Sequence, residues 1–408
     1  MYLTDTRPGA SLKGAPARRV LTGNVLALGL VSLVTDVSSE MVTAVLPAYL
    51  VLGLHLGVAQ YGAFDGLYTG ATALTRLAGG YLADRLRRRK LVAAVGYGLS
   101  ALAKVGLLLT PAAPAAVGAV LAADRTGKGL RTAPRDALIT LSAPREQLGR
   151  AFGAHRALDS LGAFAGPIVA LGVLALAGGA GRSWDAVFVT SLCFALLGVL
   201  LLALFVRDRE QPLPPGAVSP RAALALLKAG PLRAVCAGAA LLGLATVGDG
   251  FVYLLLQHRD DLPLTTFPLL AVGTACAYLV LAPPLGRLAD RIGRRPVALG
   301  GYGALLAVYL LLATGRGPLW AVLLLYGAFY AATDGVLMAL AGPLTAPELR
   351  TTGLALVQTC QALAYLVSSL LFGLAWQHLG STTACLAAAA AAVAAMAAAA
   401  PLLKGTTR

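Results

Sequence analysis

A short charged motif occurs twice in this chain, about half the chain length apart. Residues 80–90 read GYLADRLRRRK, and residues 286–296 read GRLADRIGRRP. Each copy follows one long apolar segment and precedes another. A duplicated half with a charged turn at the same place in each copy is typical of membrane transporters. The repeat therefore predicts two structurally equivalent halves within the 408 residues.

The apolar segments have the length of membrane-spanning helices. The chain is 58% hydrophobic and 12% charged, whereas soluble domains carry roughly 25% charged residues. A helix needs roughly 20 apolar residues to cross a hydrocarbon core about 30 Å thick. We therefore expect an all-helical (all-α) membrane protein with twelve transmembrane helices in two pseudo-symmetric six-helix bundles. The expected spans are residues 21–50, 59–82, 91–110, 115–140, 151–177, 186–206, 232–256, 265–285, 297–314, 319–341, 353–376 and 382–403.

One long polar break separates the first six spans from the last six. It is rich in proline and carries charges of both signs. We expect an N-terminal bundle over residues 1–206, a cytoplasmic linker over 207–231 and a C-terminal bundle over 232–408. Within the linker, residues 219–228 either form a short interfacial helix or belong to a flexible connection.

The positive charge of the chain is distributed unevenly between its two sides. A net charge of +15 could indicate a nucleic-acid partner. When the N-terminus is placed inside and the spans alternate, however, the outer loops carry only Arg182, Arg259 and Arg316 of the 33 basic residues. Such asymmetry follows the positive-inside rule. It predicts a multi-pass protein of the bacterial inner membrane with both termini in the cytoplasm, and it argues against nucleic-acid binding.

The repeated motif resembles the best-known signature of the major facilitator superfamily, Gly-x-Leu-Ala-Asp-Arg-x-Gly-Arg-Arg at the turns after spans two and eight. The resemblance extends over the whole chain. The second copy has the expected Gly293, whereas the first copy departs from the pattern at Arg87. Residues 125–136 also resemble a run found in bacterial efflux-type members. The resemblance implies a transporter in which two bundles rock about a central site.

The motif implies a conformational latch on the inner side. In the family fold, Asp84 and Asp290 accept hydrogen bonds from a helix start in the opposite bundle when the transporter opens outward. The alternative is an ordinary basic loop that obeys the charge rule. The expected latch residues are Gly80, Asp84, Arg85, Arg88, Gly286, Asp290, Arg291 and Arg294.

Charged residues inside the spans point to the transport path. Each costs roughly 2.5–3.5 kcal/mol at the centre of a span, so it persists only where it is paired or faces a wet cavity. Asp36 and Glu40 are four residues apart and share one helix face. The resemblance implies that spans one, four, seven and ten line the path. The expected residues for proton coupling and translocation are Asp36, Glu40, Arg125, Lys128, Arg131, Asp249 and Asp334.

Proton coupling requires a buried carboxylate beside a cation, so that protonation breaks an ion pair. Asp36 or Glu40 facing Arg125 or Lys128 would supply such a pair. Two alternatives remain open. The charges could form a static network that only holds the bundle together, or the span-four cations could favour an anionic substrate group.

The fifth span contains a small-residue motif, Gly162-x-x-x-Gly166-Pro167. Small residues four apart favour close helix packing, and an internal proline bends a helix. The motif resembles the signature of proton-linked antiporters, although Ala170 and Leu171 replace its closing glycines. It therefore favours export.

The sequence predicts a secondary active transporter that exports a small organic molecule in exchange for protons. Such a protein works within the lipid bilayer, here expected as a monomer. Uptake of an anionic solute or metal chelate is the alternative within transporters, and a non-transporting receptor or scaffold is the alternative of another class. No phosphate-binding Gly-x-x-x-x-Gly-Lys-Ser/Thr motif occurs. We expect no cofactor, no metal site and no enzyme activity.

Overall fold

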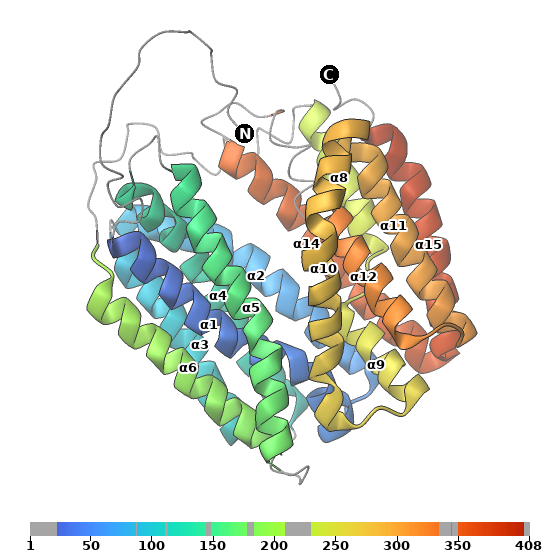
Figure 1. Ribbon diagram of the computed structural model, residues 1–408, viewed down its shortest axis with the longest axis horizontal. Coiled ribbons are helices and arrows are strands. Elements are labelled where there is room, and N and C mark those ends of the chain that lie inside the picture. The colour runs from blue at the N-terminus through green and yellow to red at the C-terminus, as the bar shows by residue number, and fades with distance from the viewer. Residues whose placement is uncertain are drawn as a thin grey trace.

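The computed structural model describes residues 23–86, 88–110, 113–143, 148–177, 183–208, 230–333, 344 and 350–403. All regular secondary structure in these ranges is helical. Figure 1 shows two bundles side by side, the N-terminal one in blue to green and the C-terminal one in yellow to red. The expected all-helical, two-bundle fold is confirmed.

The helices of the N-terminal half follow the expected spans to within a few residues. They are α1 (Gly23–Ala48) with its π-helical continuation η1 (Tyr49–Gly53), α2 (Val58–Leu86), α3 (Arg89–Leu109), α4 (Pro114–Ser142), α5 (Leu148–Leu176) and α6 (Ser183–Phe205).

The C-terminal half differs from the expectation at its first span. The stretch expected at 232–256 is divided into α8 (Gly230–Leu244) and α9 (Asp249–Asp260). The other elements are the short 3₁₀ turn η3 (Leu264–Thr266), α10 (Pro268–Ile292), α11 (Arg294–Thr314), α12 (Leu319–Thr333), α14 (Arg350–Leu379) and α15 (Ser381–Leu402).

Nine helical stretches among the described residues are long and apolar enough to cross a membrane. Helices α2 and α4 have the length but are more polar, and the described part of α12 has only 15 residues. Together they account for the twelve helices of the fold. A polar span can be stable in lipid only where its neighbours cover its polar groups, and this directs attention to α2 and α4.

The two bundles are closed against each other at one end of the molecule. We call the end where α2 and α10 finish, next to the charged motifs, the motif side, and the opposite end the far side. On the far side α2 packs directly on α14, where a Cβ at Gly66 would lie 2.8 Å from the carbonyl oxygen of Leu366. The ring of Phe251 packs edge-to-face against those of Tyr61 and Phe372 across the same contact, at centroid distances of 4.8 and 4.9 Å.

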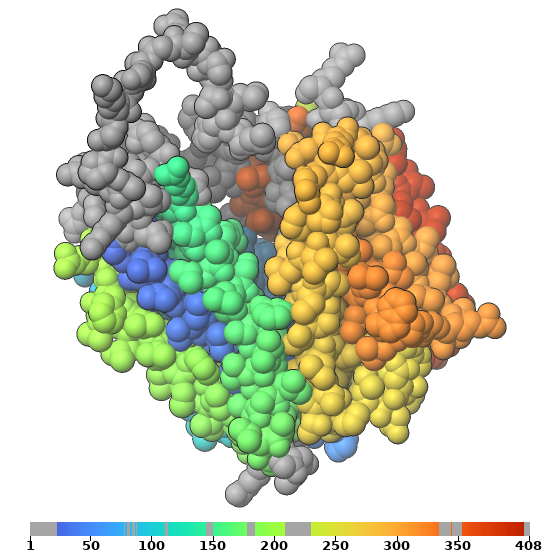
Figure 2. All heavy atoms as spheres, viewed as in Figure 1, coloured from blue at the N-terminus to red at the C-terminus, as the bar shows by residue number. Residues whose placement is uncertain are grey.

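The bundles separate toward the motif side. Figure 2 shows the surface hollowed between the upper parts of α5 and α10. Asp290 and Arg291, at the motif-side end of α10, are exposed. The structure is therefore a conformation closed on the far side and open on the motif side.

Candidate functional site

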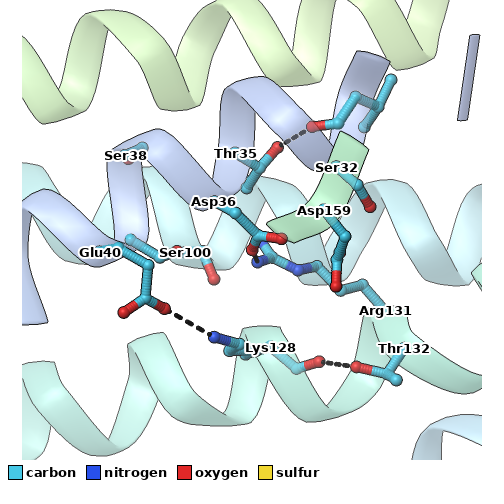
Figure 3. A network of polar contacts seen from close by, with 12 residues as sticks. Ser32, Thr35, Asp36, Ser38, Glu40, Ser100, Lys128, Arg131, Thr132 and Asp159 are labelled. Carbon is cyan, nitrogen blue, oxygen red and sulfur yellow. Dashed lines mark hydrogen bonds and ion pairs between the residues drawn. The ribbon is translucent and has the colours of Figure 1, made fainter. Parts of the chain in front are cut away.

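Carboxylates of α1 meet cations of α4 inside the N-terminal bundle. Figure 3 shows Asp36 and Glu40 on α1, with Lys128 and Arg131 facing them from α4. Glu40 Oε1 lies 3.3 Å from Lys128 Nζ, and Asp36 Oδ1 lies 3.8 Å from Arg131 Nη2. The spacing of four residues on α1 and three on α4 puts each pair on facing helix surfaces. The expected contact between Glu40 and Lys128 is present, whereas Asp36 pairs with Arg131.

These two pairs differ in burial. The side chains of Glu40 and Lys128 are 26% and 30% exposed, while that of Arg131 is 3% exposed. Figure 3 also shows Asp159 of α5 beside Asp36, so a second carboxylate approaches the Asp36 pair. Asp36 is 12% exposed, so Glu40 is the more accessible of the two carboxylates and the better placed to exchange a proton with a water-filled cavity.

Arg125 has a different partner from the one expected. Asp124 binds both Lys104 of α3 and Arg125, whose Nη2 lies 2.7 Å from Asp124 Oδ2. These three side chains are 2 to 6% exposed. The guanidinium of Arg125 also lies 3.5 Å from the ring centroid of Tyr68, in cation–π geometry. Arg125 thus shares Asp124 with Lys104, and its ion pair is with Asp124 rather than with Asp36 or Glu40.

The glycines of α5 bring this helix against the same part of α1. A Cβ at Gly162 would lie 2.9 Å from Leu33 Cα, and one at Gly166 would lie 2.8 Å from Glu40 Cβ. Pro167 follows inside the helix and is buried. Close packing at small residues is what the motif predicts. Because the contact falls on Glu40 itself, α5 helps to fix the position of this carboxylate.

A cavity of about 300 Å³ lies between the bundles. Two carboxylates line it, Asp65 from α2 and Asp249 from α9, together with aromatic side chains of both halves. Asp65 Oδ2 accepts hydrogen bonds from Tyr365 Oη at 2.9 Å and Ser369 Oγ at 2.6 Å, both on α14. We refer to this space as the acidic cavity. Its lining includes Thr43, Tyr61, Phe64, Asp65, Tyr68, Thr69, Asp249, Tyr330 and Tyr365.

A second cavity of about 320 Å³ adjoins the first and shares Tyr68 and Thr69 with it. Its charged lining residues are all cations, and α14 forms its opposite wall. We refer to it as the basic cavity. Arg76 Nη1 donates to Gln358 Oε1 at 2.8 Å across the two bundles. The charged residues that line it are Arg76, Arg125 and Lys128.

The break between α8 and α9 positions Asp249. Residues 245–248 are not helical, so their backbone groups need partners within the protein. Tyr309 Oη accepts from Val247 N at 2.8 Å and donates to Ala245 O at 2.9 Å, and Tyr326 Oη donates to Val247 O at 3.1 Å. The new helix then starts at Asp249, whose carboxylate lines the acidic cavity.

Sequence reasoning did not select Asp65 and Arg76 as site residues. Both are charged residues inside a predicted span, which was the available signal. They lie on span two, which the family resemblance does not place on the path. Asp334, which sequence reasoning did select, lies outside the described residues.

The first copy of the expected latch is only partly described. Gly80, Asp84 and Arg85 lie in the last turns of α2, and Arg88 directly precedes α3. The side chains of Asp84 and Arg85 are outside the described part of the structure. The latch therefore stays a prediction for this copy.

The second copy shows its turn geometry. Gly293 has φ +97°, a backbone conformation that favours glycine, and it links α10 to Arg294 at the start of α11. A Cβ at Gly286 would meet no atom within 4 Å, and Asp290 is exposed without an ion pair among the described residues. The latch is expected to close only when the motif side closes, and this conformation is open there.

Comparisons with known proteins identify the family. The sequence model of the Major Facilitator Superfamily matches residues 28–275 and 259–408. An uncharacterized MFS-type transporter of Methanocaldococcus jannaschii is 29% identical over 376 residues, which cover 88% of this chain and 90% of the relative.

Solved structures share the fold at low sequence identity. The nucleoside transporter NupG has a TM-score of 0.76 at 15% identity, covering 94% of this chain and 100% of that one. A D-xylose–proton symporter has a TM-score of 0.74 at 17% identity, covering 92% and 96%. The chain is a multi-pass transport protein and not an enzyme; it belongs to the major facilitator superfamily.

Proposed function

We propose that this transporter exports a small organic molecule from the bacterial cytoplasm in exchange for protons, by alternating access. The motif side is the cytoplasmic side in this proposal, as the positive-inside distribution predicts. The present conformation, open on the motif side, is then the one that receives substrate from the cell. The opposite conformation would separate α2 from α14 on the far side and close the latch.

The ion pair between Glu40 and Lys128 is the observation that carries the proposal. It joins α1 to α4 at the margin of the basic cavity, and both side chains are partly exposed. A proton arriving at Glu40 would break the pair and leave Lys128 as an uncompensated cation in the membrane interior. The free-energy cost of the unpaired Lys128 is relieved when the bundles move or a substrate leaves, and this links protonation to transport.

Two features favour export over uptake. The Gly162–Pro167 segment resembles the antiporter signature, and it packs directly on Glu40. Arg125 and Lys128, the cations that would favour an anionic solute or metal chelate, are each paired with a carboxylate. An anion that bound Arg125 or Lys128 would compete with the carboxylate already paired to that cation.

The test uses purified protein in liposomes that enclose a pH-sensitive dye. A panel of cationic, neutral, zwitterionic and anionic solutes is added to wild type and to Glu40→Gln. We expect at least one solute to drive proton movement in wild type, and about tenfold less or none in the variant. Asp185→Asn is the matched control, because Asp185 is an exposed carboxylate at the start of α6.

A Glu40→Gln protein that moves protons as fast as wild type contradicts the assignment of Glu40. Proton movement in the same direction as the solute contradicts exchange and indicates symport. Accumulation of radiolabelled solute in right-side-out vesicles with an inward proton gradient would then support the uptake alternative.

A further inference from the structure

The two carboxylates of the acidic cavity have no ion pair among the described residues. Asp65 accepts hydrogen bonds from two hydroxyls, and Asp249 accepts one from the backbone N–H of Gly250 at 3.1 Å. Neither carboxylate has a cation within ion-pair distance in the described part of the chain, and no basic side chain is among the residues that line this cavity. A buried carboxylate is either protonated or balanced by a positive group, so a cationic ligand would stabilise its charged form.

The hydroxyl of Tyr61 is a further polar group at this cavity. The side chain of Tyr61 is only 3% exposed and lines the acidic cavity. Its ring packs on Phe251, but its hydroxyl forms no hydrogen bond with any described residue. An incoming ligand that reaches Asp249 could also contact this hydroxyl, since Gly250, the next residue, lies directly against it.

Aromatic rings complete a site suited to an ammonium group. Phe64, Tyr68, Tyr330 and Tyr365 line the cavity beside the two carboxylates. Aromatic faces attract organic cations, and the attraction increases where water is excluded. The chemistry of this cavity therefore selects a positively charged organic group.

Among the described residues that line the adjoining basic cavity, Arg76 is the cation without a carboxylate partner. Arg125 is paired with Asp124, and Lys128 is paired with Glu40. Arg76 has no ion pair with any described residue, and its buried Nε lacks a hydrogen-bond partner there. Its only described hydrogen bond goes to the neutral Gln358. A guanidinium in this position can bind a carboxylate or phosphate.

The two unbalanced charges lie on one face of one helix. Asp65 and Arg76 are both on α2, eleven residues apart, which is about three turns and roughly 16 Å along the axis. Tyr68 and Thr69 lie between them and line both cavities. The two cavities are thus neighbouring compartments of one space between α2 and α14, with opposite charge at its ends.

We propose that the substrate is an elongated zwitterion whose ammonium group binds between Asp65 and Asp249 and whose anionic group binds Arg76. The proposal rests on the proposed function, whose substrate it specifies. A compact α-amino acid is too short to reach both ends, so the charges of the substrate are separated by a chain or ring system that lies along Tyr68.

The test measures equilibrium binding to the purified, full-length protein in detergent by calorimetry, without a proton gradient. The probes are ω-amino acids of increasing chain length, each with the alkylamine and the alkanoic acid of the same length. We expect an optimum length at which the ω-amino acid binds about tenfold or more tightly than either singly charged analogue.

Two variants assign the two ends. Asp249→Asn should weaken the binding of the ω-amino acid and of the alkylamine by about tenfold and leave the binding of the alkanoic acid unchanged. Arg76→Gln should weaken the binding of the ω-amino acid and of the alkanoic acid and leave the binding of the alkylamine unchanged. Asp249→Glu and Arg76→Lys, which keep each charge, should recover part of the loss, and gel filtration shows which variants are folded. Asp185→Asn again serves as the exposed control.

An alkylamine that binds as tightly as the best ω-amino acid overturns the proposal, and so does a wild-type protein that binds none of the probes. An equal loss of affinity for all probes in both variants would also overturn it, because Asp249 and Arg76 would then not bind different groups of the substrate. A wild type that binds the ω-amino acid yet moves no protons in liposomes supports this inference while contradicting the proposed proton exchange.

Discussion

Asp124 and Glu40 show how differently an ion pair can be placed within one bundle. Asp124 lies between Lys104 and Arg125, with all three side chains at most 6% exposed. Glu40 and Lys128 are several times more exposed. Removal of one partner from a fully buried pair strongly destabilises the protein, because the other charge is left without compensation. Asp124 is therefore a structural residue, and Glu40 remains the candidate for proton exchange.

Replacing Asp124 by asparagine leaves two buried cations with no carboxylate between them. We expect Asp124→Asn to lower the free energy of unfolding by about 3–5 kcal/mol. The same change at the exposed Asp185 should cost at most about 1 kcal/mol, through the lost charge at the start of α6. Thermal unfolding of both variants in detergent tests this, and similar melting temperatures for the two would contradict the structural role of Asp124.

At the break between α8 and α9, buried backbone groups need partners just as buried charges do. Residues 245–248 leave the helical path, and hydroxyls of Tyr309 on α11 and Tyr326 on α12 bind the freed groups. Thr246 Oγ1 also lies 3.2 Å from Tyr302 Oη. The break is thus held by the neighbouring helices of the C-terminal bundle.

Removal of the Tyr309 hydroxyl should destabilise this break. Tyr309→Phe leaves the buried Val247 N–H and Ala245 C=O without that partner, which costs about 1–3 kcal/mol for a buried unsatisfied group. Tyr97→Phe is the matched control, because the buried Tyr97 hydroxyl has no hydrogen-bond partner in the described structure. Thermal unfolding should show a lower melting temperature for Tyr309→Phe only. Equal stability of the two variants would contradict the role assigned to the tyrosine.

The elements differ in how far the sequence predicts them. The spans of the N-terminal half were predicted to within a few residues, because long apolar segments in lipid must be helical. The contact of Glu40 with Lys128 is one of the four pairings that the sequence left open, and helical spacing did not choose among them. The break at 245–248 was not predicted, since it lies inside one long apolar segment. The hydroxyls that bind its backbone groups are about 60 to 80 residues away in sequence. The pairing of Asp65 with Tyr365 joins the two halves across 300 residues, beyond any local pattern.

For the whole molecule, the contact between α2 and α14 decides which side is closed. Gly62 and Gly66 allow this contact, and the carbonyl oxygen of Ser369 lies against the position of a Cβ on Gly62. Backbone atoms cannot move aside as a flexible side chain can. A side chain at Gly62 therefore acts against the far-side-closed conformation without touching either cavity lining.

We expect Gly62→Val to shift the population toward the conformation that is closed on the motif side. Spin labels at the exposed Arg150 of α5 and Leu288 of α10, with the five native cysteines replaced, should come closer in this variant. Gly172→Val is the control, since a Cβ there meets no atom within 4 Å. A distance distribution identical to that of the control would show that this contact does not set the conformational equilibrium.

The polarity of α4 has a consequence for how the protein is made. This helix carries six ionisable residues from Asp124 to Asp136, and each costs about 2.5–3.5 kcal/mol at the centre of a span on translocon scales. Its charge partners include Asp36 and Glu40 of α1 and Lys104 of α3, which are synthesised earlier. A nascent α4 cannot leave the translocon for lipid by itself. The insertion of α4 into the membrane therefore depends on helices that are already inserted. Its ion pairs can form at that stage only because the partner helices α1 and α3 precede α4 in the chain.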